Sequence, residues 1–303
     1  MRCLVTGGAG FIGHHLVEHL IGQGHDLTVT DIKDESEVME VYGCNSLPFY
    51  YHKADIADDP RLCDVVRGID RVYHLASRCE INNGCDFNRD TFETTKAVLN
   101  AMKECDVKEL FFASTSAVYG EGDWSFREND ALNPISEYGI AKMKSEEAIR
   151  CACESRIMRA VVFRMANVVG PDQTHGVAFD FVRKLKDDCI KLKILGDGRQ
   201  TKEYIFVDDV INAMDRVFLS NQNVFEIFNV SSGTTISVLE IADEICRIMG
   251  LTDVEYDVGD TRFGWEGDVP NFMLNTDKIE SAGWKPLFDS RDAIRKSVAG
   301  FLK

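Results

Sequence analysis

Several features that would place a protein in a membrane or an oxidising compartment are missing from this chain of 303 residues. No apolar run is long enough to cross a bilayer, and the first residues already read as a strand. We therefore expect neither a signal peptide nor a membrane anchor. The ten cysteines include no Cys-x-x-Cys pair, and Cys151 and Cys153 would point to different sides of a helix. These thiols are predicted to be reduced in a cytoplasmic protein.

Positive charge is scarce as well. The chain has 34 Lys and Arg residues but 50 Asp and Glu residues, which gives a formal net charge of −16. This charge argues against nucleic acid and against an anionic membrane as partners. Internal repeats, low-complexity tracts and long flexible linkers are also lacking. With 45% hydrophobic residues the chain is large enough for one large domain or two closely packed ones.

A glycine-rich segment follows the apolar run 3–5. Gly7, Gly10 and Gly13 are spaced for a tight turn that leads into an amphipathic helix beginning near Phe11 and Ile12. Such a turn lets the backbone approach a pyrophosphate, and the helix N-terminus offers it N–H groups and a positive dipole. The segment predicts a dinucleotide site.

A second predicted strand, 26–30, ends in Asp31, 18 positions after Gly13. An acid near this offset accepts hydrogen bonds from the adenosine ribose. The same carboxylate would repel a 2′-phosphate, and the nearest cation is Lys33. The sequence therefore favours NAD over NADP as cofactor.

The first half of the chain alternates apolar strands with helices. Strands are expected at 2–6, 26–30, 49–53, 71–75, 109–114 and 159–164, and helices at 11–23, 58–67, 87–105 and 136–154. This alternation predicts an α/β fold, a doubly wound parallel sheet of the Rossmann type.

The pattern changes after Gly170 and Pro171. Later helices are expected at 176–188, 208–219, 237–249 and from 290, and strands at 204–207 and 225–230. We predict an NAD-binding domain at 1–166, to which 204–228 returns, and a smaller discontinuous α/β substrate domain at 167–203 and 229–303.

Three hydroxyl residues, Ser114, Thr115 and Ser116, stand where the predicted strand 109–114 ends. Tyr138 and Lys142 follow at positions i and i+4 and share one helix face. A free tyrosine has a pKa of about 10 and is a poor base at neutral pH. A nearby ammonium and a positive nicotinamide ring would both favour the phenolate. We therefore interpret Tyr138 as the general base, and as the acid in reverse, with Lys142 supplying charge and holding the nicotinamide ribose.

Together the Gly-x-x-Gly-x-x-Gly turn, the strand-end hydroxyls and Tyr-x-x-x-Lys resemble the extended short-chain dehydrogenases/reductases. The branch is that of the NAD-dependent nucleotide-sugar epimerases and dehydratases. The runs 166–177 and 264–270 are most similar to archaeal-type UDP-glucose 4-epimerases. The resemblance implies a nucleoside-diphosphate sugar as substrate, and a homodimer in which helices near 91–104 and 136–154 pair.

The resemblance also implies roles for further residues. Thr115 would hydrogen-bond the same sugar hydroxyl as Tyr138. Contacts to the cofactor would come from a set that flanks the strand ends, namely Asp55, Ile56, Leu75, Ala76, Ser77, Ser114 and Val168. The substrate would meet Asn167 at its diphosphate, and otherwise Ser116, His175, Gly176, Val177, Lys202, Tyr204, Arg262 and Asp268.

Departures from the family pattern narrow the reaction. Relatives that dehydrate or decarboxylate sugars carry carboxylates where this chain has Ser116 and Ala117. The family's usual asparagine is Thr91 here, and Lys202 replaces an arginine and so lacks its bidentate fork. We expect epimerisation at C4 through a transient 4-keto sugar, without a metal, since no His or Cys spacing suggests one. A deoxysugar reductase or dehydratase and a non-catalytic NAD sensor remain as alternatives.

Overall fold

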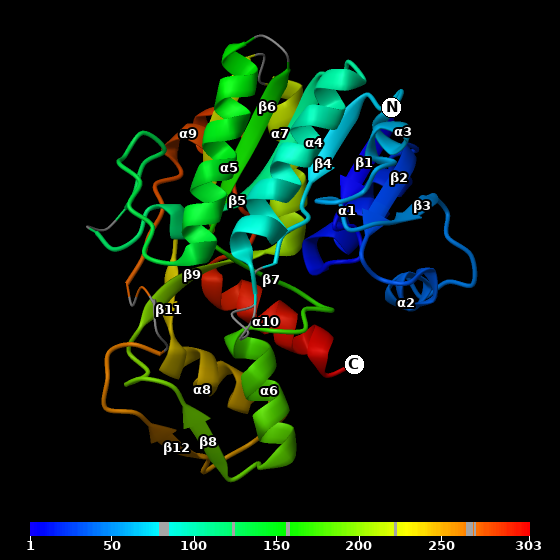
Figure 1. Cartoon of the computed structure of the whole chain (residues 1–303). Coiled ribbons are helices and arrows are strands. Elements are labelled where there is room, and N and C mark those ends of the chain that lie inside the picture. Colours follow the sequence, from blue (N-terminus) through cyan, green and yellow to red (C-terminus); the bar gives the residue numbers. More distant parts are fainter. Residues whose placement is uncertain (79–84, 123–124, 156–157, 221–222, 265–268, 270) are drawn as a thin grey trace. The chain divides into compact units, whose positions relative to one another are not determined.

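The computed structural model describes residues 1–78, 85–122, 125–155, 158–220, 223–264, 269 and 271–303 (Figure 1). They form two compact units, one of Met1–Val118, Leu132–Arg164 and Ser220–Phe228, the other of Tyr119–Ala131, Met165–Leu219 and Asn229–Lys303. Residues 119–131 and 204–219 thus group with the second unit, whereas the sequence assigned them to the first. The division into an NAD-binding and a substrate-binding domain stays a prediction.

The central sheet has seven strands in the order β10-β6-β5-β4-β1-β2-β3. Their bounds are β1 Arg2–Thr6, β2 Asp26–Asp31, β3 Tyr50–Lys53, β4 Arg71–His74, β5 Glu109–Thr115, β6 Arg159–Met165 and β10 Phe225–Val230. The pairs β1–β2, β2–β3, β1–β4 and β4–β5 are parallel. After β3 the chain returns to pair β4 with β1, which creates a topological switch point between these two strands. The predicted Rossmann-type fold is confirmed.

Helices cover the sheet of the first unit, and Figure 1 shows α4 and α5 side by side in front of it. The helices are α1 Phe11–Gly22, α2 Glu35–Val41, α3 Leu62–Val66, α4 Thr94–Glu104 and α5 Glu137–Glu154, with a π-helix, η1 Asn88–Glu93, before α4 and a 3₁₀ turn, η2 Ser116–Val118. Because side chains alternate along a strand, Leu110 and Phe112 face the helices with Val98, Met102 and Ile149. The intervening Phe111 instead contacts Phe163, with ring centroids 4.9 Å apart.

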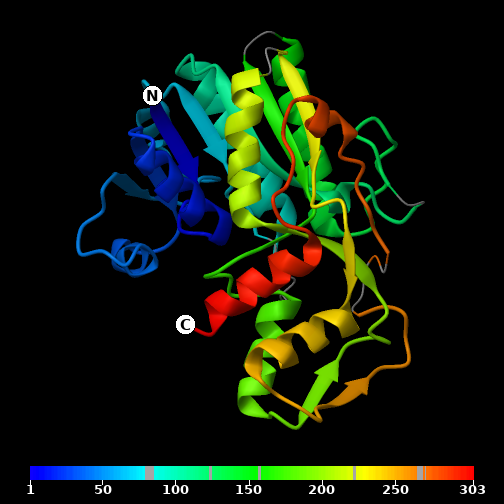
Figure 2. The same ribbon diagram turned by 180° about the vertical axis from the view of Figure 1, so that it is seen from behind.

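The second unit contains two small sheets, β11-β9-β7 and β12-β8. The strands are β7 Asn167–Val169, β8 Lys191–Ile194, β9 Thr201–Phe206, β11 Thr235–Ser237 and β12 Glu255–Val258, and the helices α6 Val177–Asp187, α7 Val207–Ser220, α8 Val238–Met249, α9 Asp277–Ser281 and α10 Ser290–Phe301. Figure 2 shows α6, α8 and α10 packed against one another. Their shared core includes Phe181, Leu185, Ile241, Ile245 and Ile294.

Most elements agree with the sequence to within a few residues, with two kinds of correction. The strand expected at 204–207 begins at Thr201, and the helix expected at 87–105 begins as the π-helix η1. Short elements of the described residues that were not predicted are α2, η2, β7, β8, β11, β12 and α9. Within the described residues, no helix is long and apolar enough to cross a membrane.

A buried carboxylate ties α8 to α10. Glu244 is 8% exposed and accepts hydrogen bonds from Arg247, Arg291 and Arg295 at 2.7, 2.7 and 2.9 Å. Hydrogen bonds from these guanidinium groups, Arg295 first, lower the pKa of Glu244 to about 2. A carboxyl group with a lowered folded-state pKa stabilises the fold above its ordinary value of 4.5. That contribution is lost as the pH falls towards 2.

We expect Glu244→Gln to lower the free energy of unfolding by about 1–2 kcal/mol at pH 7. The difference from the unsubstituted protein should shrink below pH 4.5. Urea unfolding followed by tryptophan fluorescence at stepwise lower pH measures it. Glu255→Gln is the matched control, because that carboxylate is 72% exposed and should cost under about 0.5 kcal/mol. A difference that stays constant down to pH 3 would contradict this role of Glu244.

Candidate active site

The glycine-rich turn between β1 and α1 has no room for side chains. Gly7 adopts a left-handed φ of +69°, and a Cβ there would lie 2.8 Å from the Ala76 nitrogen. A Cβ on Gly13 would lie 2.1 Å from the Gly7 carbonyl oxygen. Both approaches are closer than any carbon could tolerate, so the turn needs glycine at these positions. Gly10 lies between them and is also the N-cap of α1.

Asp31 is fixed against this turn at the end of β2. Its carboxylate accepts the Ala9 N–H at 3.0 Å and the Ile32 N–H at 2.8 Å. The Lys33 ammonium also binds the turn, because it donates a hydrogen bond to the Ala9 carbonyl at 2.8 Å. The turn and the acid that the sequence singled out are therefore neighbours, an arrangement suited to a dinucleotide with its ribose at Asp31.

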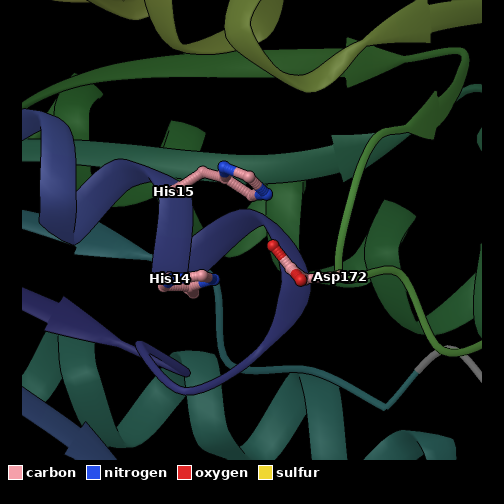
Figure 3. A group of neighbouring side chains, drawn as sticks. All are labelled: His14, His15 and Asp172. Carbon is pink, nitrogen blue, oxygen red and sulfur yellow. The ribbon is translucent and has the colours of Figure 1, made fainter. Parts of the chain in front are cut away.

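The first turns of α1 carry two histidines whose imidazoles lie 5.0 Å apart (Figure 3). His14 is buried edge-on against the Tyr42 ring, and the Tyr42 hydroxyl donates to the Gly8 carbonyl at 2.6 Å. These contacts add a second layer of support behind the glycine-rich turn. Asp172, which is also labelled in Figure 3, is a residue of the second unit.

His74 ends β4 and is fully buried. Its Nδ1 lies 2.8 Å from the Thr6 hydroxyl, which accepts the Ala76 N–H, and its Nε2 lies 3.1 Å from the Thr95 hydroxyl. Because the Thr95 hydroxyl donates to the Thr91 carbonyl at 2.7 Å, it accepts from Nε2–H. Burial, with a smaller effect of the Lys142 charge, lowers the pKa of His74 to about 3. The ring is thus a neutral link between the end of β1 and the first turn of α4.

Other residues predicted beside the cofactor lie along the same strand ends. The Ser77 hydroxyl is 2.8 Å from that of the buried Thr91, so threonine occupies the place of the family's asparagine without reaching outward. The Asp55 carboxylate accepts a hydrogen bond from the Arg89 guanidinium at 2.7 Å. The next residue, Ile56, is buried, and Leu75 is half-buried. The Asp55 carboxylate, which the resemblance places at the cofactor, is therefore already paired.

The candidate catalytic residues converge at the end of β5. Lys142 is 2% exposed, donates to the Ala113 carbonyl at 2.7 Å, and lies 4.8 Å from the Phe112 ring centroid and 5.8 Å from that of Tyr138. Thr115 ends the strand, and its hydroxyl accepts the Ala117 N–H at 3.1 Å. Ser116 begins η2 and is half-buried.

Ser114 lies deeper than the sequence indicated. It is buried, and its hydroxyl donates to Glu146 on α5. Glu146 in turn binds Arg164 of β6 through Nε and Nη2, at 3.1 and 2.6 Å. Sequence reasoning missed Glu146 and Arg164. A charged residue one turn after Lys142, on the buried face of an amphipathic helix, was the available signal.

The residues predicted at the substrate belong, apart from Thr115, Ser116 and Tyr138, to the second unit. Asn167 on β7 donates to the Glu203 carbonyl at 3.1 Å, and Val168 follows it. Burial raises the pKa of the Glu203 carboxyl to about 7. Lys202 and Tyr204 flank Glu203 on β9, and His175 and Gly176 precede Val177, the first residue of α6. Arg262 lies over the Phe263 ring at 4.6 Å, and Asp268 is outside the described residues.

Comparisons with known proteins show which family the chain belongs to. A model of the NAD-dependent epimerase/dehydratase family matches residues 3–231. The chain belongs to this family. It is 31% identical to the "Putative UDP-glucose 4-epimerase" of Methanocaldococcus jannaschii, with 97% of this chain and 96% of that protein covered. It is 27% identical to a mouse dTDP-D-glucose 4,6-dehydratase, with 100% and 89% covered.

The structure is also similar to a crystal structure of a Thermotoga maritima UDP-glucose 4-epimerase with UDP-glucose. The TM-score is 0.88 at 26% identity, with 100% of this chain and 99% of that chain covered. The relatives thus include both nucleotide-sugar 4-epimerases and dehydratases. Members of the family therefore act on more than one nucleotide sugar and catalyse more than one reaction.

The crowding at the glycine-rich turn gives a direct test. We expect Gly13→Ala to weaken NAD binding by at least about tenfold and to lower the melting temperature, because its Cβ would collide with the Gly7 carbonyl. Gly22→Ala on the same helix is the control, since its Cβ would meet nothing within 4 Å. Calorimetric titration measures the NAD affinity of both variants, and thermal unfolding measures their melting temperatures. Equal NAD affinity in the two variants would contradict the assignment of the turn.

Proposed function

We propose that this chain interconverts the C4 epimers of a UDP-sugar, with UDP-glucose and UDP-galactose as the first candidates, using tightly held NAD. The proposal rests above all on one observation: Lys142 lies 5.8 Å from the Tyr138 ring centroid and donates to the carbonyl of Ala113, two residues before Thr115 at the end of β5. The family membership and the similarity to UDP-glucose 4-epimerases support it.

The residues present fit NAD. The glycine-rich turn leaves its backbone accessible in a cradle that a Cβ would fill, and the Asp31 carboxylate lies against it. When bound, NAD supplies the hydride acceptor and donor of the reaction. Lys142 would hold the nicotinamide ribose while remaining anchored to the Ala113 carbonyl. This anchor keeps the ammonium next to Tyr138.

Proton transfer falls to Tyr138. As C4 is oxidised, its hydroxyl loses a proton, which the Tyr138 phenolate accepts while Thr115 hydrogen-bonds the same oxygen. The Lys142 ammonium favours the phenolate electrostatically. The resulting 4-keto sugar turns over in the site, and Tyr138 returns the proton as the opposite face is reduced. Such a positioned acid–base contributes about 10²–10⁴-fold.

The second candidate, dehydration, is favoured by relatives such as the mouse 4,6-dehydratase. Dehydration needs a further acid and base to remove water across two carbons. The residues next to Thr115 are Ser116, Ala117 and Val118, which offer no carboxylate. Simple oxidation and return of hydride is therefore the reaction that this set of side chains supports best.

A homodimer through α4 and α5 also stays a proposal. A cavity of about 680 Å³ runs along α5, and apolar side chains from η1, the segment before α5, α5 and β10 line it, among them Phe92, Leu132, Met143, Phe225 and Ile227. A second copy of these helices would cover this apolar surface.

Product analysis tests the reaction. Purified protein is incubated separately with UDP-galactose, UDP-glucuronate and UDP-N-acetylglucosamine, without added cofactor, and the epimers are separated by chromatography. Conversion of one sugar to its C4 epimer without net NADH would support the proposal and identify the sugar. Loss of water or stoichiometric NADH would instead support the dehydratase or reductase alternative. No conversion even with added NAD would exclude a simple UDP-sugar 4-epimerase.

We expect Tyr138→Phe to reduce kcat by at least about 100-fold while NAD affinity stays within about twofold, because only the proton-transfer group is removed. The matched control is Tyr50→Phe, on an exposed tyrosine, with unchanged kcat. Steady-state kinetics and NAD titration of both variants provide the measurement. A Tyr138→Phe variant with full activity would favour the non-catalytic sensor.

A further inference from the structure

Three buried polar side chains form a network directly beneath the candidate catalytic residues. Glu146 is 4% exposed and Arg164 is 3% exposed, and the guanidinium Nε lies 3.1 Å from both carboxylate oxygens while Nη2 lies 2.6 Å from Oε2. The Ser114 hydroxyl donates to the same carboxylate. All three residues belong to the first unit. The proposed mechanism gives this network no role.

The network connects the two elements whose separation matters for proton transfer. Tyr138, Lys142 and Glu146 follow one another at intervals of four along α5, so they share a face of the helix. Ala113, Ser114 and Thr115 are consecutive at the end of β5. Lys142 contacts the first of these strand residues and Glu146 the second, so two successive turns of α5 are bound to the strand end that carries Thr115.

Such contacts fix the position of a helix along its own axis, relative to the sheet, more strictly than apolar packing does. Leu and Val side chains allow a helix to slide by a fraction of an ångström at little cost, whereas bidentate guanidinium–carboxylate pairs are directional. Arg164 comes from β6, the neighbour of β5 in the sheet. Glu146 is therefore bound to two strands, through Arg164 of β6 and Ser114 of β5. A buried pair of this kind is weak evidence for stability but a known means of specifying geometry.

The pair also balances charge near Lys142. Among the described residues, His74 of β4, which is neutral, and Arg164 of β6 face this part of α5, while Lys144, Glu147 and Arg150 lie on the helix itself. The neighbouring η1 adds charges that are paired, Arg89 with Asp55, Asp58 and Asp90, and Glu93 with Lys96. Glu147 and Arg150 are paired with each other. With Glu146 compensated by Arg164, Lys142 is the buried cation that acts on Tyr138.

We propose that Glu146, Arg164 and Ser114 are positioning residues that hold the Tyr138–Lys142 face of α5 in register with Thr115 and keep the added charge there at zero. The kinetic part of this inference rests on the proposed function. The electrostatic part does not, because it concerns the ionisation of Tyr138 in the NAD-bound protein whatever sugar is used.

Four variants separate the two parts. Glu146→Gln leaves the Arg164 cation uncompensated at a helix position eight residues, or ~12 Å, from that of Tyr138. At an effective dielectric constant of about 20, the pH at which Tyr138 ionises should fall by roughly 0.5–1 unit. Glu146→Leu with Arg164→Met removes both charges, so the midpoint should return to within about 0.3 unit of the original. This double variant also removes the clamp, so kcat should fall by about 10- to 100-fold with KM unchanged.

Ser114→Ala is the mildest change, because it removes one hydroxyl and keeps the ion pair. We expect kcat to fall several-fold with an unchanged midpoint and NAD affinity, and this variant decides the positioning role if the double variant does not fold. Glu109→Gln is the matched control. It breaks a Glu–Arg link between the same strands, to Arg159 at 3.2 Å, at the opposite end of β5. It should alter stability alone.

The midpoint is measured by ultraviolet difference absorbance of tyrosinate against Tyr138→Phe, and kcat and KM come from the epimerase assay. Opposite results overturn the proposal: a Glu146→Gln midpoint equal to that of the original protein, a folded double variant or Ser114→Ala variant with full kcat, or the same changes in Glu109→Gln. If the unsubstituted protein converts no UDP-sugar, the proposed function fails, and the midpoints still decide whether Glu146 and Arg164 set the charge at Tyr138.

Discussion

The buried ammonium of Lys142 is the constraint on which the arrangement of the first unit depends. A charge with 2% exposure is tolerated only where polar partners replace water, and the Ala113 carbonyl and the Phe112 ring provide them. Burial, with a smaller effect of the same charge, lowers the pKa of His74 and keeps its ring neutral, so that the ring joins Thr6 to Thr95 by hydrogen bonds that need a single tautomer. The positions of Lys142, His74 and the strand ends that they contact therefore depend on one another.

The local features were predictable because their signals are local. The glycine spacing reflects a turn in which Gly13 packs on Gly7, and Tyr138 and Lys142 are four positions apart on one helix. The strands of the central sheet have apolar runs long enough to be recognised. Asp31 was predicted from its distance along the chain, since the second strand of this fold pairs with the first.

Other features depend on which elements become neighbours, and a single sequence does not reveal that. Glu146 and Arg164 meet because β6 lies beside β5, and neither residue stands in a recognisable motif. The strands β7 and β11 have three residues each and exist through pairing with β9. The π-helix η1 places Thr91 against Ser77, where helical periodicity alone predicted a regular helix. The alternation of strands and helices grouped 204–219 with the first domain, whereas the contacts of these residues group them with the second unit.

The most direct test of hydride return at C4 uses UDP-galactose that carries deuterium at that carbon. Epimerisation by oxidation and reduction at one carbon predicts UDP-glucose with the deuterium still on C4, and a slower reaction than with the unlabelled sugar. Deuterium that appears in solvent water, or a product with unlabelled C4, would contradict the mechanism proposed for Tyr138, Lys142 and Thr115.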